Sequence, residues 1–508
     1  MLYGFAAGYT LRGSSSMCGF IGIFGPDGTD VAPEIYEGLL AVQHRGQDAA
    51  GITTFTDRFK VKKGFGLVVE VFNEDNMARL RGNLGLGHVR YPTVGGNADE
   101  DAQPFHHTFP LGTAMVHNGN VTNFIELHQS RFRDTGTRLN SSCDLEVILY
   151  VFQQGLAERY ENKGSIDVDD VFFAIKKVYD EVKGAYSVCA MIADMGMVCF
   201  RDPYGIKPIC FGERDDPEGK SFACASESVV LDINGYERTL DIGPGEAVFV
   251  DMQRKIHRRN IESNVHTPCV FEWVYFSRPD SFLDDVSVYK TRQRFGEALG
   301  KQWRDCGAPM PDVVMPVPDS ARDAALAVAQ ELGVTYREGL VKNRYIGRTF
   351  IMPDQESRSS SIRRKLNTID IEFRDKKVLL VDDSVVRGNT SRRIVGMARE
   401  AGASEVYLGV TSPPLVAPCP YGIDMASKRE FIADGLTVDE IAERLLVDHM
   451  VYLDREAMNE AARRGNSKLT KFCNACFTGE YPTPDVTLER LKAIEIEREE
   501  NRDNVSVL

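Results

Sequence analysis

The sequence predicts an α+β unit followed by an α/β unit with a mostly parallel sheet. The first prediction rests on short apolar runs, such as VCAMIA and GEAVFV, which Gly, Asp and Asn turns separate between residues 18 and 251. The second rests on the alternation of apolar strands with helical segments from residue 295 onward, which is typical of a parallel sheet with helices on both faces. The length of 508 residues suits roughly two to four domains.

The composition excludes several classes of protein. A net charge of -14 argues against broad nucleic-acid binding, because the chain would repel a polyanion. The chain lacks the run of about eighteen apolar residues that a membrane helix needs. Eleven cysteines are too sparse for a disulfide scaffold, and their odd number indicates a reducing, cytoplasmic setting. There, cysteines act as nucleophiles, metal ligands or core residues.

In the first unit, the stretch CGFIGIFG from Cys18 predicts a buried strand, and apolar spacing predicts helices at Ala32–Gln43 and Asp144–Arg159. The seventeen residues before Cys18, MLYGFAAGYTLRGSSSM, have a short apolar part that glycines interrupt, and they lack a charged n-region. We therefore expect residues 1–17 to be a leader or pro-segment that is removed, and not a secretory signal.

In the second unit, strands are expected at DVVMPV, KVLLVDD and EVYLGVT, and helices at Ala321–Leu332 and Ser391–Ala401. Residues 252–294 read as a linker of mixed structure. The charged tail at 485–508 reads as a solvated helix.

The stretch VLLVDDSVVRGNTSRRI carries the clearest chemical signal in the second unit. Asp382 and Asp383 end a strand where α/β sheets bind ligands, and their carboxylates suit sugar hydroxyls or Mg²⁺. Gly388 allows close approach of the backbone, and amides at a helix start bind phosphate. The predicted phosphate loop is Arg387, Gly388, Asn389, Thr390 and Ser391. The plainer alternative is a strand end followed by a helix cap.

Two further segments fit a polyphosphate site. The strand in MPVPDSA ends at Asp319 and Ser320, which suit the pyrophosphate side. The basic segment KNRYIGRTFIMP predicts a lid that excludes water, and the alternative is a solvated loop. Its candidate ligand contacts are Lys342, Tyr345 and Arg348, with Arg344 on the other side of the tyrosine.

Cys18 is the candidate nucleophile of the first unit, although a lone cysteine is more often a buried small hydrophobe. If residues 1–17 are removed, its own α-amino group becomes free. An α-amine has a pKa of about 7.7–8.0 and can act as general base for the thiol. An acylated nitrogen cannot do so.

Four clusters fit an amino-acid substrate beside this thiol. Arg90 in GHVRYPT suits a substrate carboxylate, and Asp144 at a helix start suits an α-ammonium. Asn118 and Gly119 in HNGNVTN suit an oxyanion hole, and Arg45 in QHRGQDAAGI is expected nearby as a further contact of the amino acid. Each has an alternative reading as a surface ion pair, helix cap or hairpin turn.

Four cysteines stand apart from the rest, two of them beside prolines and two in a CxxC pair. Ligand count alone suits a [4Fe–4S] cluster and a zinc ion equally well, and free or redox-active thiols are further alternatives. The candidate ligands are Cys269, Cys419, Cys473 and Cys476. The other cysteines are interpreted as structural, namely Cys143, Cys189, Cys199, Cys210, Cys224 and Cys306.

Together, CGFIGIFG, QHRGQDAAG, GHVRYPT, HNGNVTN and the Asp144 segment resemble the N-terminal-nucleophile glutamine amidotransferase domain, an αββα sandwich. The VDDSVVRGNTS loop resembles the 5-phosphoribosyl-1-pyrophosphate (PRPP) signature of phosphoribosyltransferases. The combination resembles the glutamine PRPP amidotransferase family. It implies a pro-segment at 1–17, a glutaminase domain at 18–251, a linker at 252–294, a phosphoribosyltransferase domain at 295–484 and a tail at 485–508.

The resemblance implies that Cys18 releases ammonia from glutamine, and that the ammonia passes through an internal tunnel to C1 of PRPP. The products are 5-phosphoribosylamine, glutamate and pyrophosphate, in the first committed step of purine synthesis. One Mg²⁺ per subunit is implied at Ser320, Asp382 and Asp383, with Lys342 as a phosphate contact.

The family further implies inhibition by purine nucleotides, a homotetramer, and no nucleic-acid or membrane partner. The cysteine segments resemble its branch with a [4Fe–4S] cluster and a cleaved pro-segment. The competing hypotheses are a PRPP-sensing regulator without catalysis and a different glutamine-dependent transferase.

Overall fold

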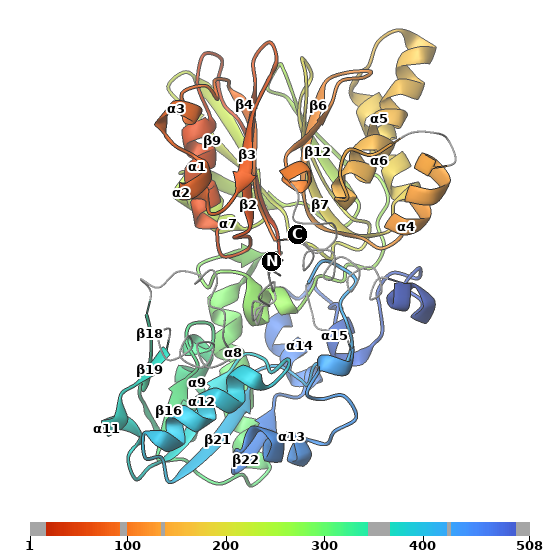
Figure 1. Ribbon diagram of the computed structural model, residues 1–508. Helices are drawn as coiled ribbons and strands as arrows, with labels where there is room; N and C mark the ends of the chain where they lie inside the picture. The colour runs from red at the N-terminus through yellow and green to blue at the C-terminus, as the bar shows by residue number, and fades with distance from the viewer. Residues whose placement is uncertain (1–16, 92–98, 134–137, 344–365, 424–427, 494–508) are drawn as a thin grey trace, which may run out of the picture.

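The computed structural model describes residues 17–91, 99–133, 138–343, 366–423 and 428–493. Its first half contains two antiparallel sheets that pack face to face (Figure 1). The seven-stranded sheet has the order β11 (Glu237–Asp241), β9 (Cys210–Asp216), β10 (Gly219–Ala225), β1 (Gly19–Phe24), β4 (Leu84–Arg90), β2 (Ala49–Phe55) and β3 (Phe59–Phe65). The six-stranded sheet has the order β13 (Ile256–Asn260), β12 (Glu246–Asp251), β8 (Gly196–Arg201), β7 (Gly184–Ile192), β6 (Thr113–Val121) and β5 (Phe105–His107).

Helices cover the outer faces of both sheets, so the first half is an αββα sandwich (Figure 1). The seven-stranded sheet carries α1 (Ala32–Ala41), α2 (Val68–Val71), α3 (Glu74–Met77) and α7 (Ser228–Ile233). The six-stranded sheet carries α4 (Phe124–Leu127), α5 (Asp144–Lys163) and α6 (Val168–Glu181). Apolar side chains fill the space between the sheets and beneath both helix layers, because residues of each strand alternate between the two faces.

The second half contains a five-stranded parallel sheet with helices on both faces. Its order is β17 (Thr335–Tyr336), β16 (Val313–Pro316), β20 (Lys377–Asp382), β21 (Glu405–Val410) and β22 (His449–Tyr452). One face packs on α8 (Val288–Asp305), α9 (Arg322–Leu332) and α14 (Arg455–Arg463), the other on α12 (Asn389–Glu400) and α13 (Val438–Leu445). The predicted fold class is therefore confirmed for both halves.

The segment between residues 252 and 294 has mixed structure, as expected. It contributes β13 to the six-stranded sheet, the short π-helix Glu272–Phe276 and the hairpin β14 (Phe282–Leu283)–β15 (Val286–Ser287). Helix α8 begins at Val288, before the expected start of the second unit. Smaller elements are β18 (Leu340–Lys342), β19 (Leu366–Thr368), α11 (Asp370–Phe373) and α15 (Ala475–Thr478).

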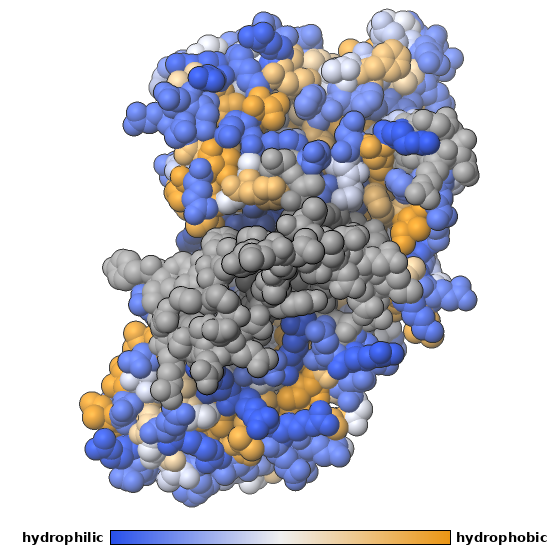
Figure 2. Space-filling view, viewed as in Figure 1, coloured by the Kyte–Doolittle hydropathy of each residue, from blue (hydrophilic) through white to orange (hydrophobic). Residues whose placement is uncertain are grey.

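The predicted helices and strands agree with the structure to within a few residues, but the longer helices α6, α8, α13 and α14 were not predicted. In α6, Val171, Ile175 and Val178 form a buried helical stripe. Among the described residues, no helix is long and apolar enough to span a membrane. Hydrophilic residues cover most of the described part of the face in Figure 2, with smaller hydrophobic patches between them.

Candidate functional site

Cys18 lies immediately before β1, and its side chain is buried. Its Sγ donates to the backbone carbonyl of Tyr91 at 3.6 Å. Burial raises the pKa of the thiol above its ordinary value, although the positive charges of Arg90 and Lys207 oppose this effect. The thiol is therefore protonated at neutral pH, and a reaction at this sulfur requires a base.

Two charged side chains act on the same thiol. Arg90 ends β4 and Asp144 begins α5, and both are buried. Asp144 Oδ2 accepts the backbone N–H of Val121 at 2.8 Å and lies 3.4 Å from His117 Nε2. Burial alone would raise the pKa of Asp144, but His117 and the Val121 N–H hold it below its ordinary value. A buried guanidinium and a buried carboxylate beside one thiol suit the two charges of an amino acid.

Asn118 and Gly119 lie in β6, the strand whose Val121 N–H donates to Asp144. The Asn118 side chain is buried, and neither its amide nitrogen nor its amide oxygen has a hydrogen-bond partner among the described residues. An unpaired buried amide is costly, so such a group indicates a ligand position. Gly119 has a φ of 152°, and a Cβ there would lie 2.0 Å from the Ala185 carbonyl oxygen. Only glycine fits at that position.

Arg45, which was expected to contact glutamine, lies between the two halves. Its guanidinium is buried and pairs with the carboxylates of Glu227 and Glu272, the second at 2.6 Å. Nη2 also donates to Ser277 Oγ at 3.2 Å. These contacts tie the loop after α1 to the π-helix Glu272–Phe276. A contact between Arg45 and glutamine stays a prediction.

We expect Arg45→Met to lower the free energy of unfolding by about 3–5 kcal/mol, because it leaves buried carboxylates unpaired. Burial alone would raise the pKa of Glu227, but the positive charges of Arg45 and His44 hold it far below its ordinary value. The stability that this pair contributes is thus present above the unfolded pKa of a glutamate and is lost as the pH falls. Urea denaturation at pH 7 and pH 4 measures both effects. Arg81→Met is the matched control, because Arg81 pairs with Asp30 at the surface; equal midpoints for the two variants would refute the expectation.

Asp382 and Asp383 lie at the carboxyl end of β20, as predicted, and both are buried. Ser320 Oγ donates to Asp383 Oδ2, and Ser384 Oγ donates to Oδ1 at 2.6 Å. Burial and then the charge of Asp383 raise the pKa of Asp382 well above its ordinary value. Burial also raises the pKa of Asp383, against the two hydroxyl donors. Two adjacent buried carboxylates and a hydroxyl form the oxygen donor set that Mg²⁺ prefers.

The predicted phosphate loop leads from these aspartates into α12. Gly388 has a φ of 75° at the helix N-cap, and a Cβ there would lie 2.4 Å from Ile432 Cδ1. The first turn of α12 therefore presents its free N–H groups, with Asn389, Thr390 and Ser391 in that turn. Arg387 pairs with Glu430 at 3.0 Å at the edge of this loop.

Lys342 Nζ lies 2.8 Å from Asp319 Oδ2, so the structure joins the start of the predicted lid to the MPVPDSA strand end. Arg344, Tyr345 and Arg348 lie outside the described residues.

The four cysteines that the sequence singled out meet in one apolar cluster between the two halves. Cys269 and Cys473 form a parallel bridge, and the carbonyl of Cys476 accepts N–H groups of Val416 and Ala417, close to Cys419 in sequence. Burial and then the nearby thiols raise the pKa of Cys476 well above its ordinary value. The contributing thiols are Cys269, Cys419 and Cys473. No three of these four sulfurs lie within 4.8 Å of one another.

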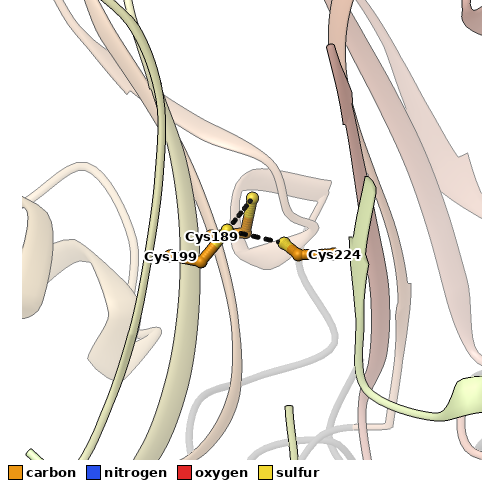
Figure 3. Close-up of side chains that lie close together, drawn as sticks. All are labelled: Cys189, Cys199 and Cys224. Atoms are coloured by element: carbon orange, nitrogen blue, oxygen red, sulfur yellow. Dashed lines mark hydrogen bonds between the residues drawn. The ribbon is translucent and has the colours of Figure 1, made fainter. Parts of the chain in front are cut away.

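A second group of thiols lies between the two sheets of the sandwich. Cys199 Sγ lies 3.6 Å from Cys189 Sγ and 2.8 Å from Cys224 Sγ, and Figure 3 shows Cys224 pointing toward the pair from the facing sheet. The three sulfurs are close enough to share one metal ion. Their surroundings, however, are apolar core residues without a charged side chain to compensate thiolates. We interpret them as core packing, as the sequence predicted.

Three buried residues at these sites carry no signal in the sequence. Arg292 donates to the carbonyls of Trp273, Tyr275 and Ser277, and its charge acts on Asp383. Glu227 and Lys207 likewise come from segments without a recognisable motif. Their positions follow from tertiary contacts, which no short pattern encodes.

Comparisons with known proteins agree with this geometry. A model of the glutamine amidotransferase domain matches residues 88–232. An amidophosphoribosyltransferase of Haemophilus influenzae is 47% identical, over 96% of this chain and 96% of the relative. One of Archaeoglobus fulgidus is 41% identical, over 92% of this chain and 98% of the relative. The structure of glutamine PRPP amidotransferase from B. subtilis, complexed with ADP and GMP, matches with a TM-score of 0.81 and 35% identity over 93% of this chain and all of that one.

Proposed function

The chain belongs to the amidophosphoribosyltransferase family, and on that premise we propose that it uses Cys18 to release ammonia from glutamine and transfers that ammonia to PRPP. The enzyme class is a glutamine-dependent glycosyltransferase of purine biosynthesis. The observation that carries the proposal is the buried amide of Asn118, which has no partner among the described residues. It lies in β6, whose Val121 N–H donates to Asp144, and Asp144 and Arg90 are the two charged residues that act on the buried Cys18 thiol together with Lys207.

In the glutaminase half-reaction, Arg90 binds the substrate carboxylate and Asp144 its α-ammonium. The free α-amine of Cys18 takes the thiol proton, and the thiolate attacks the side-chain amide carbon. The Asn118 amide and the Gly119 N–H stabilise the oxyanion. The protonated amine then gives its proton to the departing ammonia, and water hydrolyses the thioester to glutamate. This mechanism requires that residues 1–17 are removed first, because the nitrogen of Cys18 is otherwise part of a peptide bond and cannot act as a base.

In the transferase half-reaction, the first turn of α12 holds the 5-phosphate, and Lys342 contacts a phosphate. Asp382 and Asp383 orient the ribose hydroxyls, so that C1 faces the incoming ammonia. The donor set of Ser320, Asp382 and Asp383 fits one Mg²⁺, which when bound neutralises charge on the pyrophosphate leaving group. We further propose that the chain has the domain boundaries predicted above and an internal tunnel for ammonia. We also propose that purine nucleotides inhibit the enzyme and that it is a cytoplasmic homotetramer.

Cys269, Cys419, Cys473 and Cys476 are proposed to hold a [4Fe–4S] cluster. A tetrahedral zinc ion, with Zn–S bonds of about 2.3 Å, needs sulfurs roughly 3.8 Å apart. The wider spacing of these four sulfurs favours a larger group. Because the ligands come from three distant segments, the cluster would hold those segments together as a structural element.

Cys473→Ser is expected to lose iron and acid-labile sulfide and to melt several degrees below the parent. Iron analysis and calorimetry on anaerobically purified protein measure both. Cys306→Ser is the control, because Cys306 is the exposed C-cap residue of α8 and is not one of the proposed ligands. An iron-free Cys473→Ser protein that melts at the parent temperature would rule out the structural role.

The oxyanion strand also contacts the segment of Cys419 in the second half. Asn120 Nδ2 donates to the Pro420 carbonyl at 2.8 Å, and a Cβ on Gly422 would lie 2.8 Å from the Gly119 carbonyl oxygen. We expect Asn120→Ala to lower glutamine-dependent synthesis about tenfold, because the strand loses this support, and to leave ammonia-dependent synthesis intact. Asn123→Ala is the control, since among the described residues the Asn123 side chain bonds within its own half: Nδ2 donates to the Glu181 carbonyl and Oδ1 accepts the N–H of Lys183. Equal loss with both nitrogen sources would contradict the expectation.

The proposed function is tested by release of pyrophosphate that depends on both glutamine and PRPP, together with intact-mass analysis of the N-terminus. A PRPP-sensing regulator would bind PRPP and release no pyrophosphate. A different glutamine-dependent transferase would release glutamate without consuming PRPP.

A further inference from the structure

Lys207 is a buried amine without an acidic partner among the described residues. It lies between β8 and β9, and none of its surface is exposed. Within the described part of the chain, the hydrogen-bond partner of Nζ is the thioether sulfur of Met17, at 2.6 Å. A thioether is a weak acceptor, and a buried ammonium normally needs a carboxylate. The mechanism above leaves this group unused.

The position of Lys207 links the nucleophile to the four-cysteine site. Met17 precedes Cys18 and packs in the same apolar cluster as Cys269 and Cys473. The carbonyl of Ile206, next to Lys207, accepts the N–H of Cys269 at 3.1 Å. The charge of Lys207 lowers the pKa of Cys269, Cys473 and Cys18 against the effect of burial.

Removal of Met17 has a direct consequence for this arrangement. The group that Lys207 contacts departs with residues 1–17, and the new α-amine of Cys18 forms at the peptide bond that joined Met17 to Cys18. The charge of Lys207 already acts on the Cys18 side chain, and the freed α-amine belongs to the same residue. A fixed positive charge disfavours protonation of a neighbouring amine, and the effect is strong in a water-poor site.

We propose that Lys207 is a positioning residue for catalysis, whose charge keeps the freed α-amine of Cys18 unprotonated and able to accept the thiol proton. The inference rests on the proposed function. The other charges that act on Cys18 are Arg90, which supports the same effect, and Asp144, which opposes it. In the proton transfer, the thiol S–H bond breaks, an N–H bond forms on the amine, and the electron pair stays on sulfur.

The test compares pH profiles of kcat/KM for glutamine in the parent, Lys207→Met and Lys207→Arg. In Lys207→Met we expect the acid limb to move up by about one pH unit. The rate then falls about tenfold at pH 6.5 and returns to the parent value above pH 9. Lys207→Arg keeps the parent profile, because it retains the charge. Synthesis from ammonia, which does not use Cys18, stays at the parent rate in both variants.

Intact mass and iron content are measured on the same preparations, so that loss of N-terminal processing or of the cluster is seen directly. Alkylation of Cys18 by iodoacetamide across the same pH range gives a second readout, with the same expected shift. A processed, iron-loaded Lys207→Met protein with the parent acid limb would overturn the inference and leave the proposed function standing. A processed parent that releases no glutamate would instead overturn the proposed function.

Discussion

Cys18→Ser is expected to abolish glutamine-dependent formation of phosphoribosylamine, by about 10⁴-fold or more, and to leave ammonia-dependent formation at the parent rate. The hydroxyl of serine is a far weaker acid than a thiol, so the α-amine cannot generate the nucleophile. The described residues of the proposed transferase site, Ser320, Asp382 and Asp383 among them, lie in the other half of the molecule. Pyrophosphate release with glutamine and with ammonium chloride as nitrogen sources measures the two activities.

Cys143→Ser is the matched control, because this buried cysteine lies beside Asp144 in the same pocket. We expect it to retain glutamine-dependent activity within a few fold. If Cys18→Ser keeps its activity with glutamine, or if both variants lose it equally, Cys18 is not the nucleophile.

Asp383→Asn is expected to reduce synthesis about 10³-fold with either nitrogen source, while glutamine hydrolysis persists. The substitution removes one negative charge from the Mg²⁺ donor set and disrupts the contact with Ser320. Both nitrogen sources need the same activated ribose, so both reactions fail. Pyrophosphate and glutamate are measured on the same samples.

Asp312→Asn serves as the control for this variant. Asp312 lies at the opposite end of the sheet, where its carboxylate accepts the N–H of Lys377 at 2.8 Å. We expect it to leave both activities near the parent values. A selective loss of glutamine-dependent activity in Asp383→Asn would contradict the assignment of Asp383 to the PRPP site.

Local patterns predicted much of the fold, because the apolar residues of each helix or strand recur at the spacing typical of that element. The parallel sheet follows from short apolar strands between helical stripes, and α12 begins near its predicted start because Gly388 and the polar residues after it set the N-terminus. Helix α6 was missed although its buried residues have helical spacing from Val171 to Tyr179. Helix α8 was not predicted, and its buried face packs in the apolar cluster that joins the two halves.

The candidate site was predictable where one motif carries the chemistry. Asp382 and Asp383 end a strand, and Asn118 and Gly119 share one turn-like motif, so sequence neighbours became neighbours in space. Arg45 shows the limit: its side chain lies against Gly19, next to the nucleophile, but its guanidinium pairs with carboxylates from residues far away in the sequence. Lys207 has no motif, and only the fold brings it to Met17.

The central claim is that one polypeptide couples hydrolysis at Cys18 to transfer onto PRPP. The most direct test measures glutamate and pyrophosphate together, on a preparation whose mass shows that it begins at Cys18. The account predicts equal amounts of the two products when glutamine and PRPP are both present. Pyrophosphate without matching glutamate, or full activity from a chain that still carries residues 1–17, would contradict it.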